Sequence, residues 1–200
     1  MDSNVVVVRF AEPSKAYQAL SRLKQSDAEG RIGLESAVVV ERAESGALNV
    51  SDGADNLGPV GLASGSVVGM LVGVLGGPVG VLMGWGAGAL IGGAVDAGRV
   101  EQSDEALTML SRAIPPGSTA VIASVREPAT EVVDAEMTQL GGEVIRYPVD
   151  EVRAELELAQ EAADAAAKEA RRTVRAQRTA KVRATVDEKT ADVKEKLHIR

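Results

Sequence analysis

Short runs of branched apolar residues occur before residue 51 and after residue 118 of the chain, separated by polar and turn-forming residues. Runs of this length, rich in valine and isoleucine, predict β-strands. The predicted strands are residues 5–10, 37–40, 119–125 and 143–147, and residues 48–50 predict a short hairpin partner.

Each half of this pattern has a helix between two strands. Glu12 and Pro13 precede one helical run, and Glu127 and Pro128 precede the other. Proline near the first turn and a carboxylate near the helix N-terminus are both helix-start signals, so neither glutamate is interpreted as catalytic. The repeated strand–helix–strand order predicts an α+β fold, a ferredoxin-like split βαβ sheet with its helices on one face.

The centre of the chain has a different pattern. Residues 56–95 contain no charged side chain, and their glycines recur at intervals of four. Residues four apart share a helix face, so each series predicts a smooth groove for helix packing and oligomerisation. One series is Gly61, Gly65, Gly69, Gly73 and Gly77, and the other is Gly76, Gly80, Gly84, Gly88 and Gly92. The turn signal at 76–78 predicts a glycine-zipper helical hairpin of residues 60–75 and 79–95.

Each glycine costs a helix about 1 kcal/mol relative to alanine, so close packing or the exclusion of water has to offset the cost. A bilayer provides both. The two helices would span roughly 24 and 25 Å, slightly less than a bilayer core of about 30 Å. Acidic flanks (Asp52, Asp55 and Asp96) and the absence of an aromatic belt weaken this interpretation. The alternative is a protein core shared by hairpins from several subunits.

Residues 149–200 contain neither glycine nor proline and predict a long, charged, alanine-rich helix. A heptad seam begins at Val149, Val152 and Leu156 and continues as alanine, which is compatible with a weak coiled coil. The first part is acidic, and a basic block follows that could contact lipid headgroups or nucleic-acid phosphates. This block is Arg171, Arg172, Arg175, Arg178, Lys181 and Arg183.

Composition gives no indication of catalysis. The chain has no cysteine, its single histidine is His198, and its net charge of −7 disfavours general nucleic-acid binding. Asp52 and Asp55 are typical of a turn. The glycines at 84–88 have no preceding strand and no following lysine, unlike a nucleotide-binding loop. We therefore expect no enzyme, no metal, no cofactor and no small-molecule substrate.

The valine-rich first strand, the Glu-Pro helix start, the double glycine series and the closing strand to Tyr147 and Pro148 together resemble a bacterial family, domain of unknown function twelve-sixty-nine. The resemblance covers about residues 4–155. Its most specific part is the glycine segment, which is the uncharged stretch of residues 56–95. It implies a predicted membrane protein without known catalytic residues. The helix after Glu155 looks like an extension beyond the family core.

These observations predict four regions: the first half of the α/β domain (1–56), the hairpin (57–98), the second half (99–148) and the C-terminal helix (149–200). We expect a non-enzymatic, membrane-associated homo-oligomeric scaffold with a cytoplasmic α/β domain. The alternatives are a soluble cytoplasmic homo-oligomeric particle with the hairpins as its core, and a lipid-headgroup or nucleic-acid adaptor acting through the basic block. Self-association is common to the first two.

Overall fold

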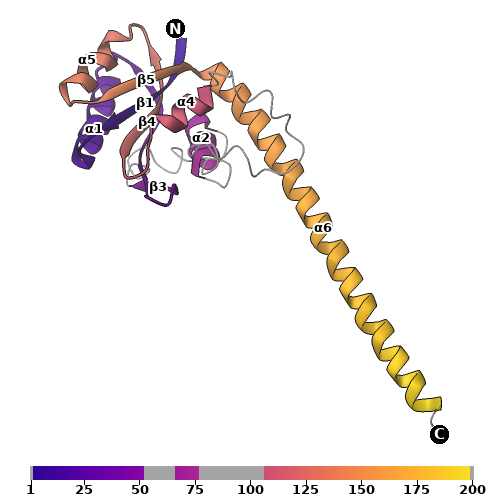
Figure 1. Cartoon of the computed structure of the whole chain (residues 1–200). Coiled ribbons are helices and arrows are strands. Elements are labelled where there is room, and N and C mark those ends of the chain that lie inside the picture. The colour runs from indigo at the N-terminus through magenta and orange to yellow at the C-terminus, as the bar shows by residue number, and fades with distance from the viewer. Residues whose placement is uncertain (1, 52–65, 77–105, 199–200) are drawn as a thin grey trace. The chain divides into compact units, whose positions relative to one another are not determined.

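The computed structural model describes residues 2–51, 66–76 and 106–198 (Figure 1). The predicted hairpin limb at 79–95 lies outside these residues. The chain divides into two compact units, Met1–Ala159 and Gln160–Arg200. The elements, in chain order, are β1 (Asp2–Phe10), α1 (Pro13–Ala28), β2 (Gly33–Arg42), β3 (Leu48–Ser51), α2 (Val67–Gly76), α4 (Ala106–Arg112), β4 (Thr119–Glu127), α5 (Glu131–Gln139), β5 (Glu143–Pro148) and α6 (Val149–His198).

The described strands form one antiparallel sheet in the order β3-β2-β4-β1-β5. The strands β1 and β2, which α1 connects, lie on either side of β4. In the same way β4 and β5, which α5 connects, lie on either side of β1. The central strands β1 and β4 are buried on both faces, which explains why their sequences are nearly continuous runs of apolar residues rather than alternating ones.

One face of the sheet is covered by α1 and α5. Val6, Val8 and Val121 from the sheet pack there with Leu23 of α1 and Met137 of α5. The recurrence of Ala16, Ala19, Leu20 and Leu23 along α1 gives that helix a single buried face. The expectation of helices on this face is confirmed.

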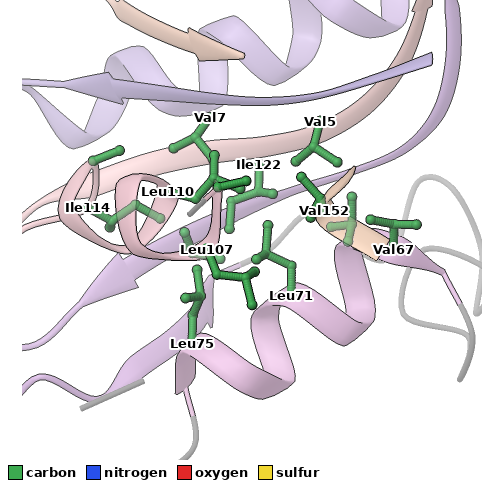
Figure 2. Packing of buried hydrophobic residues seen from close by; sticks show 14 of the residues in the cluster. Val5, Val7, Val67, Leu71, Leu75, Leu107, Leu110, Ile114, Ile122 and Val152 are labelled. Carbon is green, nitrogen blue, oxygen red and sulfur yellow. The ribbon is translucent and has the colours of Figure 1, made fainter. Parts of the chain in front are cut away.

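The opposite face is also covered, which the sequence did not predict. The strand residues Val5, Val7 and Ile122 pack there against α2, α4 and the first turns of α6, as Figure 2 shows. The buried helical residues on this face include Val67, Leu71, Leu75, Leu107, Leu110 and Val152. The prediction of helices on one face alone is therefore wrong: the sheet is the middle layer of three in the unit Met1–Ala159.

Candidate functional site

Helix α2 contains the described part of the glycine segment, and its packing is one-sided. The Ser66 hydroxyl accepts a hydrogen bond from the Gly69 backbone N–H at 3.0 Å, which caps the helix. Val67, Val68, Leu71 and Leu75 are buried. The side chains of residues four apart lie on one face of a helix, so these residues attach α2 to the sheet.

The glycines of α2 differ in their surroundings. Gly69 is half-buried and Gly73 is exposed, on the side of the helix away from Leu71 and Leu75. A Cβ atom added to Gly73 would meet no atom of the described residues within 4 Å. At Gly76, where α2 ends, an added Cβ would lie 3.3 Å from the Leu48 Cβ atom. Thus close packing among the described residues accounts for Gly76 but not for Gly73.

The other glycines predicted to form packing faces lie outside the described residues. They are Gly61, Gly65, Gly77, Gly80, Gly84, Gly88 and Gly92. The structure therefore describes only one of the two helices of the predicted hairpin, α2. The contact between the two glycine faces stays a prediction.

Helix α6 begins in the core of the unit Met1–Ala159. Val149, Val152 and Leu156 are buried, and the Glu155 carboxylate accepts hydrogen bonds from the backbone N–H groups of Ala106 (2.9 Å) and Leu107 (2.8 Å). These amides are at the N-terminus of α4. A residue of α6 thus caps α4.

Within the predicted basic block, Arg171, Arg172 and Arg175 lie on the exposed surface of α6. Arg172 is 3.8 Å from Glu169, one turn earlier. A shallow hollow between turns is lined by Ala170, Arg171, Val174 and Arg175. The remaining members, Arg178, Lys181 and Arg183, lie on the same helix, beyond the side chains that the structure describes. Exposed guanidinium groups of this kind can pair with carboxylates or phosphates.

Two polar clusters that the sequence did not predict connect α5 to the rest of the fold. Arg146 of β5 binds both oxygens of the Glu127 carboxylate, at 2.8 and 3.0 Å, and Asp134 of α5 at 2.8 Å. Burial lowers the pKa of Arg146, but the hydrogen bonds to Glu127 and Asp134 raise it more, so the net shift is upward. Glu127 is the last residue of β4 and its side chain is fully buried, so its function in the fold is this ion pair rather than the predicted helix start.

The second cluster is formed by Ser26, Arg31 and Glu136. The buried Ser26 hydroxyl lies 2.8 Å from both Glu136 oxygens, and Arg31 binds the same carboxylate. In both clusters the charged groups satisfy one another, which is typical of structural polar networks.

Arg42 has no such compensation. It is 1% exposed, and its Nε and Nη2 atoms have no hydrogen-bond partner among the described residues. It follows Val38 and Val40 at intervals of two along β2, so strand alternation directs it to the face covered by α2 and α4. Burial lowers the pKa of its guanidinium. The alternation of side chains along the strand was the sequence signal that could have predicted the burial of Arg42. It was not sufficient, because an arginine at the end of a strand is ordinarily solvated.

Within the part of the chain that the structure describes, no group of three or more acidic or histidine side chains is placed to hold a metal ion. Asp52 and Asp55 lie outside that part. Among residues 2–51, 66–76 and 106–198 we also find no helix with both the length and the apolar character needed to cross a bilayer.

Together these features define an α+β protein with a five-stranded antiparallel sheet in its described part and a long C-terminal helix. The model of the family described as Protein of unknown function (DUF1269) matches residues 62–163, and the chain belongs to this family. The match confirms the resemblance and includes the glycine segment, but residues 4–61, which the resemblance also covered, lie outside it. Searches of curated proteins and of solved structures found no match.

Proposed function

We propose that this protein is a non-enzymatic scaffold that self-associates through the glycine face of α2, defined by Gly69 and Gly73. The observation that carries the proposal is the space at Gly73, where an added Cβ would meet none of the described residues within 4 Å. Glycine in a helix interior costs about 1 kcal/mol relative to alanine. Packing within the described chain does not offset that cost at Gly73, whereas close approach of another helix backbone would.

The rest of the domain provides a rigid support for the glycine face. The arrangement of β1-α1-β2 and β4-α5-β5, with the four strands in the order β2-β4-β1-β5, supports a ferredoxin-like split βαβ sheet as the framework. The buried residues Val68, Leu71 and Leu75 hold α2 on this framework. The glycine face therefore has a fixed orientation, which lowers the entropic cost of association.

We favour a protein interface over a bilayer as the setting. Leu71 and Leu75 are fully buried on the sheet, so the apolar side of α2 is covered by protein and is not available to lipid. The uncharged sequence of residues 56–95 supports the competing hypothesis, a membrane-associated scaffold with an inserted glycine-zipper hairpin. Both hypotheses require self-association of the glycine face.

Sedimentation equilibrium of the full chain and of its Gly73→Ala and Gly73→Leu variants tests the proposal. We expect the wild-type chain to form oligomers, Ala to weaken them slightly and Leu to reduce them at least about tenfold, because a bulky side chain keeps two helix backbones apart. The urea unfolding of each variant checks that the fold is intact. A monomeric wild-type chain, or equal oligomer mass for wild type and Gly73→Leu, contradicts the proposal. Retention in the membrane fraction after alkaline carbonate washing would support the bilayer setting.

A further inference from the structure

The charges of α6 are divided between two consecutive segments. Residues 150–164 contain six acidic side chains and one arginine, and residues 171–183 contain six basic side chains and no acidic one. The point halfway between the two segments is Ala167, within an alanine run at 165–167. A helix with this pattern is complementary to a copy of itself running in the opposite direction.

Within these segments the described surface of α6 also has apolar residues in contact with solvent. Val174 is 52% exposed and lies at the edge of the hollow beside Ala170. Leu156 is buried in the core, and the same seam continues along the helix to Ala163 and Ala170. Most helical stability in proteins comes from the packing of such a face, rather than from propensity alone.

We propose that α6 pairs with α6 of a second copy of this chain, antiparallel, about a two-fold axis close to Ala167. In this arrangement the acidic segment of each copy faces the basic segment of the other. A parallel pair would place acid beside acid and base beside base, which is repulsive. The alanines at 163, 167 and 170 permit the two backbones to approach closely, and Val174 of each copy is covered by the other.

This pairing adds a second self-association surface to the proposed function and does not depend on the glycine face. The contacts involve α6 alone, so substitutions at Gly73 leave them in place. Substitutions on α6 likewise leave the glycine face of α2 unchanged. An experiment that contradicts self-association through one surface is therefore distinguishable from one that contradicts self-association through the other.

Charge reversal in the full-length chain tests the electrostatic part. The variants E161K/D164K and R171E/R172E each bring like charges together where the two segments meet near Ala167. Since exposed charge pairs contribute modestly but each substitution occurs twice in a symmetric dimer, we expect each variant to dissociate about tenfold more readily at low salt. The matched control E161K/D164K/R171E/R172E has the wild-type net charge with the signs at these four positions inverted, and it should regain wild-type affinity.

Disulfide formation tests the orientation, because the chain has no cysteine of its own. The positions chosen are Gln160 and Val174, each seven residues from Ala167 and both exposed. In an antiparallel pair two copies of residue 160 are separated by about 21 Å along the axis, whereas residue 160 of one copy lies beside residue 174 of the other. A mixture of the Gln160→Cys and Val174→Cys variants should therefore form a mixed disulfide, and Gln160→Cys alone should not.

Several results would overturn the proposal. One is faster self-crosslinking of Gln160→Cys than of the mixture, which would indicate a parallel pair. Equal dimer affinity in the wild type and both double variants would remove the charge argument. A chain that gives no mixed disulfide, and whose R171E/R172E variant instead loses binding to anionic lipid vesicles or to RNA, would show that the basic block serves a different partner.

Discussion

The carboxylate of Glu155 on α6 accepts a hydrogen bond of 2.9 Å from the backbone N–H of Ala106, the first residue of α4. A second bond, of 2.8 Å, comes from the N–H of Leu107. These two amides would have no acceptor within their own helix, and the positive end of the helix dipole favours a negative group beside them. The contact joins the family-matched central region to the start of the long helix and fixes the position of both on the sheet.

Removal of this cap should destabilise the domain. We expect Glu155→Ala to lower the free energy of unfolding by about 1–2 kcal/mol, the range for losing a charged helix cap. Glu155→Gln, which retains one acceptor but no charge, should have a smaller effect. Urea unfolding followed by circular dichroism measures both. Glu151→Ala, an exposed substitution one turn earlier on α6, is the matched control and should change stability little; an equal loss in the control would contradict the prediction.

The ion pair of Glu127 and Arg146 should behave as a unit. Arg146→Met leaves the buried Glu127 carboxylate without its bidentate partner, so we expect a loss of about 3 kcal/mol. The double variant Glu127→Met/Arg146→Met removes both charges and should recover most of that loss. A double-mutant cycle by urea unfolding measures the coupling. Additive losses from the two single variants would show that the pair is not coupled.

Arg42 provides a substitution that should stabilise the protein. Replacing it with methionine, of similar length, removes a buried guanidinium whose Nε and Nη2 atoms have no partner among the described residues. Because an unpaired buried charge is costly, we expect Arg42→Met to raise the free energy of unfolding by about 1 kcal/mol or more. Thermal unfolding provides the measurement. A fall in stability of similar size would instead indicate that the charge has a carboxylate partner.

Two glycine-to-alanine substitutions should have opposite effects. At Gly142 a Cβ would lie 2.6 Å from Phe10 Cε1 and 2.7 Å from Val8 Cγ1, so Gly142→Ala should destabilise by about 1–3 kcal/mol through overpacking. At Gly73 the space is open, and Gly73→Ala should stabilise α2 by up to about 1 kcal/mol through helix propensity. Chemical unfolding of the two variants side by side measures this difference. Equal changes in the free energy of unfolding would contradict the prediction.

Local patterns in the sequence predicted most of the elements. The valine run of β1 and the apolar run of β4 predicted these two strands, because strands buried on both faces are nearly continuous in apolar residues. Pro13 marked the start of α1, and the absence of glycine and proline after Val149 marked α6. By contrast, helix α5 begins at Glu131, three residues after the proline taken as its start signal. The interpretation of Glu127 as a start signal failed because its partner, Arg146, lies on another strand.

The candidate packing surfaces were predictable in part. The spacing of Gly69 and Gly73 placed both on one face of a helix, and this follows from helix geometry alone. The sequence did not indicate which other face of α2 would be buried, because almost every side chain around that helix is apolar and its periodicity is weak. That choice depends on the sheet surface formed by Val5, Val7 and Ile122.

By itself the sequence determined the strands, the one-sided apolar face of α1, the glycine spacing and the division of charge along α6, because these depend on residues close together in the chain. Tertiary structure decided the order of the strands, the covering of the second sheet face by α2, and the cap that Glu155 gives to Ala106. Each of these depends on groups distant in sequence, whose pairing is selected by the burial and hydrogen bonding of the whole domain rather than by local propensity.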